Sequence, residues 1–444
     1  MSSTKEKLNT FSLTMIVIGF VIGMGIFRTA TDAAQASINS TVFFTAWILG
    51  GVVALCGALS YAEIGSRYPI TGGYYKIFSY AYHPSIAFAL NCIILFSNAA
   101  SLSGVAIIGS EYLLPLIFGD QYPEYYNSVL SISAILSFYG LNMLGLRMSS
   151  RTQNILMLIK LSMLLVIIIA VFLPHDSIPI VSKPETIIGN QANFFASLGA
   201  ALVAVCFTYG GYQQSINFGE EVNKPERTVP RGILIGISAV ILIYFLVNYS
   251  YHQIIGFEGL KTTKGIASLI AEHVFGENGR KIFSILLFVA VLAYVNVLML
   301  SNPRVMYAMA DDGVLPPIFQ KKFGTHQVLA LNLTVFAILS IITLVFASTF
   351  DKILGFVMFL DSVGMVSSAA TLFYMRRRRL GEDKEQIYKM GLYPYATVFF
   401  ILVYLFVCFT IVKNSPHLAL FGTIVFIGFF GLYFVIRSFK PKPL

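Results

Sequence analysis

The chain has 444 residues, of which 57% are hydrophobic and only 11% are charged, and its formal net charge is +9. Soluble domains contain roughly 45–50% apolar and about 25% charged residues, and a soluble fold of this length could not hide so much apolar surface. The composition therefore excludes a water-soluble enzyme, a nucleic-acid-binding protein and a disordered chain. It predicts an all-α membrane protein.

Twelve apolar segments are each long enough to cross a bilayer as a helix, which takes about 20 residues. In chain order they cover residues 11–36, 42–64, 86–112, 128–146, 155–173, 194–218, 233–255, 282–309, 328–346, 353–374, 395–412 and 418–436. The segments are continuous rather than alternating, which disfavours a transmembrane barrel. We therefore expect a single transmembrane domain of twelve helices over residues 1–444.

The distribution of lysine and arginine predicts the orientation. With twelve spans both termini lie on one side, and 21 of the 30 lysines and arginines fall on that side. Eight fall on the other side, and Lys160 lies within the fifth segment. Because basic loops face the cytoplasm, we expect both termini to be cytoplasmic. The four arginines at residues 376–379 follow the tenth segment, and we interpret them as a stop-transfer anchor.

Glycines interrupt the first and the sixth segment. Gly19, Gly23 and Gly25 lie in the first, and Gly210 and Gly211 lie in the sixth. Each costs about 1 kcal/mol in a helix interior relative to alanine, although close helix packing is an alternative reason for them. The two interruptions are five segments apart, and this spacing suggests two inverted repeats, residues 10–174 and 192–376, followed by two peripheral helices in residues 392–437. In transporters built from inverted repeats, paired interrupted helices form a binding site near the bilayer midplane.

Four motifs, in order along residues 10–380, resemble those of the amino acid–polyamine–organocation family. Residues 23–27, Gly-Met-Gly-Ile-Phe, resemble its Gly-Ser-Gly-Ile-Phe motif. The other three resemble the connection of its second and third helices, its sixth helix with the following loop, and the end of its eighth helix; they lie at residues 61–74, 207–227 and 301–316. The L-type amino acid transporters and their bacterial relatives are the most similar branch. The resemblance implies a LeuT-type 5+5 inverted repeat in a bacterial cell membrane.

The resemblance also implies which residues bind the substrate. The amino acid carboxylate would lie on the backbone N–H groups of the first interruption, and its ammonium on carbonyl oxygens of both. Phe207 matches an aromatic residue that closes over the substrate. The candidates in the two interruptions are Val21, Gly23, Met24, Gly25, Ile26, Phe207, Thr208 and Gly210. Met24 stands where the family usually has serine, so the hydroxyl donor of serine is lost. The motif does not define the shape of the side-chain pocket, because methionine is larger and adaptable.

Lys160 is the candidate coupling residue. It lies nine residues after Arg151, which is about 13 Å along a helix and close to the middle of a roughly 30 Å core. A lysine at such a depth is functional by default, although snorkelling to the surface is the alternative. By resemblance it occupies a position where sodium-coupled relatives bind a cation between the first and eighth helices. It would be a fixed charge in an exchanger or a proton carrier in a symporter.

Three further polar residues are candidates for the side-chain pocket: Asn98, Asn296 and Asp361. As a charged group, Asp361 would favour a cationic substrate; as a protonated group, it would act as a hydrogen-bond donor or carry a proton. Burial for packing is the remaining interpretation. Glu63, Glu220 and Glu221 lie at the ends of segments, and we expect them to form exposed pairs with Arg67, Arg227 or Arg231.

We expect sodium-independent transport of neutral L-amino acids by alternating access, through exchange or proton symport. A cationic amino acid permease and a non-transporting amino-acid sensor are the alternatives. The spans contain no nucleophile elbow, metal-binding histidine pair or phosphate loop, so we expect no enzymatic activity, no cofactor and no metal. The expected partners are the amino acid, the lipid bilayer and, under symport, protons. The expected oligomeric state is a monomer or a weak homodimer.

Overall fold

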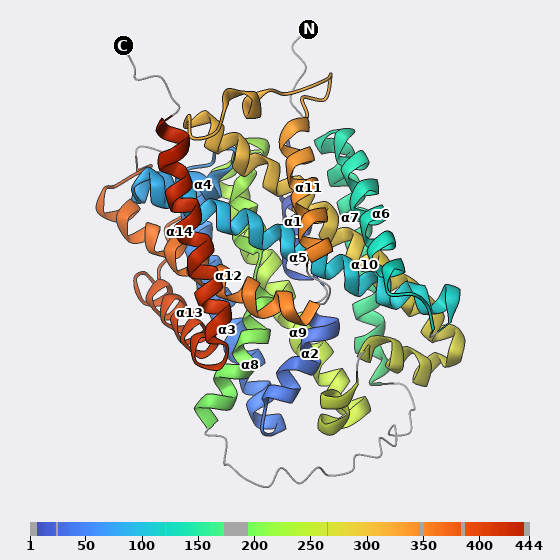
Figure 1. Cartoon of the computed structure of the whole chain (residues 1–444). Coiled ribbons are helices and arrows are strands. Elements are labelled where there is room, and N and C mark those ends of the chain that lie inside the picture. The colour runs from blue at the N-terminus through green and yellow to red at the C-terminus, as the bar shows by residue number, and fades with distance from the viewer. Residues whose placement is uncertain are drawn as a thin grey trace, which may run out of the picture.

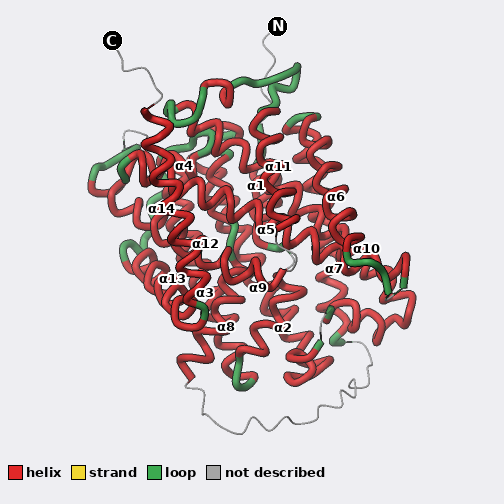
Figure 2. Tube along the Cα trace, in the orientation of Figure 1, coloured by secondary structure: helices red, strands yellow, loops and turns green. Residues whose placement is uncertain are grey.

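The structure is a computed structural model of the whole chain. It describes residues 7–23, 25–119, 121–172, 194–263, 265–346, 350–382 and 387–438, with the side chains of residues 350–356 left out. Within these ranges every regular element is a helix, and the extended backbone pairs only in three isolated bridges. Figure 2 shows long helices joined mostly by short connections.

The helices of the first half of the chain are α1 (Thr10–Val21), α2 (Gly25–Ala36), α3 (Ser40–Arg67), α4 (Gly73–Ala81), α5 (Pro84–Phe118), α6 (Tyr125–Met143) and α7 (Leu146–Ala170). Those of the second half are α8 (Phe194–Tyr209), α9 (Pro225–Thr262), α10 (Ile266–Asp311), α11 (Ala330–Phe346), α12 (Phe350–Arg377), α13 (Tyr395–Asn414) and α14 (Pro416–Ser438). Three short 3₁₀ helices are η1 (Tyr212–Asn217), η2 (Gly219–Glu221) and η3 (Pro317–Gln320). The start of α1 and the end of α14 lie at the same end of the bundle (Figure 1).

Ten helices or helix pairs in the described ranges are long and apolar enough to cross a membrane. Many large apolar side chains on them point outward, for example Leu402 on α13 and Phe409 two turns further on. Such a surface suits lipid and not water. The chain is therefore an integral, multi-pass membrane protein. Two of the twelve expected segments lie on helices outside these ten, namely α6, with 19 residues, and α11, with 17.

The core surrounds the two halves of the first apolar segment. Helix α1 packs against α7, α9 and α10, and α2 packs against α8 and α9. Glycines on α9 allow this close approach, because a Cβ atom on Gly236 would lie only 2.6 Å from Val17 Cγ1 on α1. In contrast, α14 buries only three residues and lies at the periphery of the bundle (Figure 1). The first interrupted segment is thus enclosed by neighbouring helices on several sides.

Both expected interruptions are present. Helix α1 ends at Val21 and α2 begins at Gly25; Met24, between them, lies outside the described residues. Helix α8 ends at Tyr209, and the chain continues as η1 from Tyr212. Gly211 has a φ of 106°, and a Cβ there would lie 2.6 Å from the carbonyl oxygen of Phe20. Only glycine fits this contact between the two interruptions.

Candidate functional site

A tyrosine on α9 joins the two interrupted helices. The hydroxyl of Tyr244 donates to the carbonyl oxygen of Val21 at 2.9 Å and lies 3.2 Å from the carbonyl oxygen of Thr208. The side chain is fully buried. Backbone carbonyls that lose their helical partners need another donor, and Tyr244 supplies one where α1 and α8 end.

Beyond the interruptions, α2 and α8 are in direct contact. A Cβ atom on Gly25 would lie 2.8 Å from Thr208 Cγ2 and 3.1 Å from Thr208 Cα. The hydroxyl of Thr29 donates to the carbonyl oxygen of Gly25 at 2.6 Å and is also hydrogen-bonded to the hydroxyl of Thr208. The two helices are therefore held closely on this side of the interruptions.

A cavity of about 30 Å³ lies between the interruptions. This volume holds a water molecule or two, so the site is too small for an amino acid in this structure, and we call this arrangement closed. Eight of the candidate residues line the cavity: Val21, Gly23, Gly25, Asn98, Phe207, Thr208, Gly210 and Asp361. Segments that are far apart in the sequence, from α1 to α12, thus meet at one place.

The sequence patterns do not identify four other lining residues, Phe20, Ser101, Val105 and Tyr294. Helical spacing could have identified two of them. Ser101 and Val105 follow Asn98 by three and seven residues on α5, so they lie on the same face of that helix. Tyr294 on α10 has no such signal. Its hydroxyl is hydrogen-bonded to that of Ser101 at 2.8 Å.

Asp361 is the one lining residue with a formal charge among those that the structure describes. Its Oδ1 atom accepts a hydrogen bond from the Ser97 hydroxyl at 2.8 Å. A carboxylate inside a membrane protein is costly unless a cation, a proton or several donors compensate it. The cavity therefore suits a donor group of a substrate, or a proton, at this carboxyl.

An amide chain connects three elements beside the cavity. Gln214 Nε2 in η1 donates to Asn98 Oδ1 at 2.8 Å, and Asn98 Nδ2 donates to Asn302 Oδ1 on α10 at 2.7 Å. All three side chains are buried. Asn98 thus lines the cavity but uses both of its polar atoms to hold η1 and α10 to α5.

Lys160 contacts the first interruption but does not line the cavity. Its side chain is fully buried, and Nζ donates to the carbonyl oxygen of Ile22 at 2.5 Å. Ile22 directly follows the last residue of α1. Among the described residues, the structure contains no hydrogen bond from Lys160 to α10.

Three candidates lie elsewhere or are not described. Asn296 is not part of the cavity, because its amide faces α6 and α7: Nδ2 donates to Gln153 Oε1 at 2.8 Å, and Oδ1 accepts from Asn142 at 2.9 Å. Ile26 is fully buried and does not line the cavity. Met24 lies outside the described residues.

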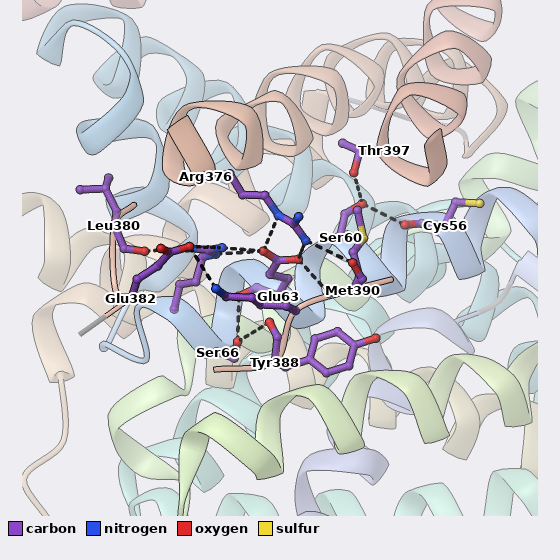
Figure 3. Close-up of polar contacts among 12 residues, drawn as sticks. Cys56, Ser60, Glu63, Ser66, Arg376, Leu380, Glu382, Tyr388, Met390 and Thr397 are labelled. Atoms are coloured by element: carbon purple, nitrogen blue, oxygen red, sulfur yellow. Dashed lines mark hydrogen bonds and ion pairs between the residues drawn. The ribbon is translucent and has the colours of Figure 1, made fainter. Parts of the chain in front are cut away.

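The acidic residues at the helix ends differ from the expectation in burial and in partners. Glu63 does bind Arg67, but both side chains are fully buried. The Glu63 carboxylate also accepts hydrogen bonds from Arg376 at 2.8 and 2.6 Å and from the Met390 backbone N–H at 2.9 Å (Figure 3). The first arginine of the run at residues 376–379 is therefore part of a buried ion cluster. The stop-transfer interpretation of the run stays a prediction.

Within the described part of the chain, Glu220 and Glu221 form no ion pair with Arg227 or Arg231. Glu221 Oε2 accepts from Arg304 Nε at 2.9 Å, and Glu220 Oε2 accepts from the Thr71 hydroxyl at 2.9 Å. The expectation was wrong because η2 turns these carboxylates toward α10 and the connection before α4, and not along the start of α9.

These features define a multi-pass helical membrane protein with a closed pocket between two interrupted helices. Comparison with known families identifies it further: the profile of the amino acid permease family matches residues 8–436. The chain belongs to this family, within the amino acid–polyamine–organocation group, and is an amino acid permease.

Three relatives illustrate the range of the family. The serine/threonine exchanger SteT of Bacillus subtilis is 28% identical, over 99% of this chain and 98% of its own length. The human cystine/glutamate transporter is 25% identical, over 99% of this chain and 87% of its own length. The branched-chain amino acid permease BcaP of Bacillus subtilis is 26% identical, over 73% and 71% of the two chains. All three names describe transporters, and their substrates differ.

Proposed function

We propose that this protein is a sodium-independent secondary transporter that moves amino acids across a bacterial cell membrane by alternating access. The observation that carries the proposal is the closed cavity between the two interrupted helices, which α5, α10 and α12 also line. Midplane sites of this kind occur in transporters built from inverted repeats. The proposed architecture has twelve spans: repeats at residues 10–174 and 192–376, then two peripheral helices at residues 392–437.

The substrate carboxylate would bind the backbone N–H groups of Met24, Gly25 and Ile26, of which the last two begin α2. The positive end of the helix dipole and its unpaired N–H groups favour an anion there. Gly25 begins α2 and lines the cavity, which supports this assignment. A carboxylate would reach the backbone only if residue 25 has no side chain.

The substrate ammonium would bind carbonyl oxygens of Val21, Phe207 and Gly210. In the closed arrangement, the Val21 carbonyl accepts from Tyr244 and from the Gly23 N–H at 2.8 Å. The Phe207 carbonyl accepts from the Gly210 N–H at 3.1 Å. Each carbonyl has two lone pairs, so binding requires the site to open and some of these bonds to be exchanged for bonds to the ammonium.

Lys160 supports sodium independence. Its ammonium lies on the Ile22 carbonyl oxygen, so a tethered cation already compensates a carbonyl at the end of α1. A fixed charge would suit an exchanger, and a proton released during the cycle would suit a symporter. Measuring transport in sodium-free buffer tests the proposed sodium independence directly.

We propose neutral amino acids as substrates, because the cavity has only one charged lining residue and several hydroxyl and amide groups. Asp361 is the observation that favours a second candidate, a cationic amino acid permease, since its carboxylate could pair with an ammonium or guanidinium side chain. The deciding experiment is counterflow of each labelled amino acid in proteoliposomes containing the purified protein. Counterflow of serine, threonine or another neutral amino acid supports the proposal, and counterflow of lysine and arginine alone supports the second candidate.

The same experiment separates a transporter from a sensor. A non-transporting sensor would bind amino acid in detergent but show no counterflow after reconstitution. Omitting the internal amino acid should abolish uptake by an exchanger. Collapsing the pH gradient should abolish concentrative uptake by a proton symporter.

We further propose that both termini are cytoplasmic and that the protein is a monomer or a weak homodimer. The unequal distribution of lysine and arginine supports this orientation. Single cysteines at Glu277 and Lys321, introduced after replacement of the four native cysteines, test it. In intact cells an impermeant thiol reagent should label residue 277 and should not label residue 321. The opposite pattern would invert the topology.

A further inference from the structure

A second and much larger cavity lies where α7 begins and α10 ends. Its volume is about 590 Å³, and it shares no lining residue with the pocket between the interrupted helices. The lining comes from the segment before α1, the start of α7, the end of α10, and the connection that precedes α11. None of the residues proposed to bind the substrate lines this cavity.

Basic side chains from four separate segments converge on the cavity. They are Lys7, Arg147, Arg151, Arg304 and Lys322. The two acidic lining residues already have partners, because Glu221 binds Arg304 and Glu220 accepts from Thr71. The lining therefore keeps an excess of positive charge. The positive-inside rule explains basic loops on this side, but it does not require them to surround one cavity.

Two of the basic residues are available to an external anion. Arg151 is exposed and makes no ion pair within the described part of the chain. Lys322 is exposed and lies over the ring of Tyr307, with Nζ 4.9 Å from the ring centre. A guanidinium group offers paired donors that match a phosphate group, and an ammonium adds a point charge.

Part of the lining is apolar and exposed. Leu144, which caps the end of α6, and Met148, in the first turn of α7, are 53% and 45% exposed, and Leu329 and Leu333 line the cavity from the α11 side. The capping residue of α7 is Gly145, whose lack of a side chain leaves the first-turn N–H groups without a side-chain cap. Their partial positive charge adds to that of the arginines. The cavity thus combines basic lining residues with apolar ones, and we call the latter its apolar wall.

We infer that this cavity binds a phosphate-bearing amphipathic anion, and that an anionic phospholipid of the cytoplasmic leaflet is the ligand that the lining favours. Basic pockets between helices on the cytoplasmic side are suited to anionic headgroups. The apolar wall would contact the upper part of the acyl chains, and Arg151 and Lys322 would bind the phosphate. This inference uses the proposed orientation but not the proposed transport mechanism.

The test measures binding and does not depend on transport. The purified full-length protein in detergent is titrated with short-chain phosphatidylglycerol or phosphatidylcholine, and bound lipid is counted by native mass spectrometry. Inorganic phosphate and glycerol phosphate are added as competitors in separate arms. The double variant Arg151→Gln/Lys322→Gln removes the two exposed cations. The double variant Arg377→Gln/Arg378→Gln is the matched control, because it removes two exposed cations at the end of α12 and directly after it. One of them, Arg378, also lies over a tyrosine ring, that of Tyr374.

We expect phosphatidylglycerol to bind the wild type and the control equally, and phosphatidylcholine to bind neither. Binding to Arg151→Gln/Lys322→Gln should be roughly tenfold weaker or more, because each basic side chain near an anionic lipid contributes measurably to affinity. The charge-conserving variant Arg151→Lys/Lys322→Arg should restore binding. Displacement by inorganic phosphate would show that the headgroup chemistry alone is recognised, and failure of phosphate to compete would show that the acyl chains contribute. Equal binding of phosphatidylglycerol to all variants, or no selectivity over phosphatidylcholine, would overturn the inference.

Discussion

Lys160 on α7 donates a hydrogen bond from Nζ to the carbonyl oxygen of Ile22 at 2.5 Å, across 138 residues of sequence. Ile22 directly follows α1, and the lysine is fully buried. The contact therefore ties the end of an interrupted helix to a neighbouring, continuous helix. Any motion that separates α1 from α7 must break this buried hydrogen bond, which is stronger than one between neutral groups while the lysine is protonated.

Lys160→Ala should slow transport more than it weakens substrate binding. The substitution leaves the Ile22 carbonyl without its donor, and hydrogen bonds to charged groups contribute about 1.5–3 kcal/mol, so we expect the turnover rate to fall roughly tenfold or more. Substrate affinity should fall less, since Lys160 does not line the pocket. Rates come from counterflow, and affinities from thermal-shift titration of the detergent-purified protein.

The pH dependence of this variant separates the two proposed roles of the lysine. If Lys160 carries the coupled proton, the alanine variant should lose the pH dependence of uptake; if Lys160 is a fixed charge, the dependence should persist at a lower rate. Full transport by Lys160→Ala, or a strict sodium requirement of the wild type, would identify Lys160 as a residue without a coupling role.

Gly25→Val should abolish transport while the protein stays folded in the membrane. Any Cβ atom at residue 25 would lie 2.8 Å from Thr208 Cγ2, and a β-branched side chain would also cover the backbone N–H groups proposed for the carboxylate. Gly428→Val is the matched control, because a Cβ atom there meets nothing within 4 Å. Counterflow and gel-filtration profiles should distinguish the two variants. Wild-type transport by Gly25→Val would rule out the carboxylate site at the start of α2.

Asp361→Asn tests the substrate class. Asparagine keeps an acceptor for the Ser97 hydroxyl but removes the charge, so a permease for neutral amino acids should retain counterflow of its substrate. Competition by lysine and arginine should be weak in both proteins. Asp312→Asn, outside the pocket, is the control for loss of an acidic group. If lysine and arginine inhibit counterflow strongly in the wild type but do not inhibit it in Asp361→Asn, the protein is a cationic amino acid permease.

Glu63→Gln should destabilise the protein without altering the pocket. The Glu63 carboxylate is fully buried and binds both Arg67 and Arg376, and removing one partner of a buried ion pair costs about 3–5 kcal/mol. We expect a clearly lower melting temperature in fluorescence-detected gel filtration. Glu277→Gln is the control, because its pair with Lys281 is exposed and should have little effect. Equal melting temperatures for the two variants would show that the buried ion cluster is not a stabilising element.

Composition and local pattern were sufficient for the class of protein and for the two interruptions. The apolar fraction requires lipid, and glycines at residues 23, 25, 210 and 211 predict interrupted helices because glycine disfavours a helix and permits backbone contact. The depth of Lys160 within its segment depends only on the rise per residue of a helix. These conclusions rest on properties that each segment has by itself.

Tertiary structure decided which faces meet. The sequence shows that Asn98, Ser101 and Val105 share a face of α5, but packing alone determines that this face lines the pocket, whereas Asn296 on α10 faces α6 and α7. Likewise, Arg376 reaches Glu63 across 313 residues. Helical periodicity specifies the relative directions of side chains on one helix, but the rotation of each helix about its own axis depends on the summed packing of all its neighbours, which no single segment encodes.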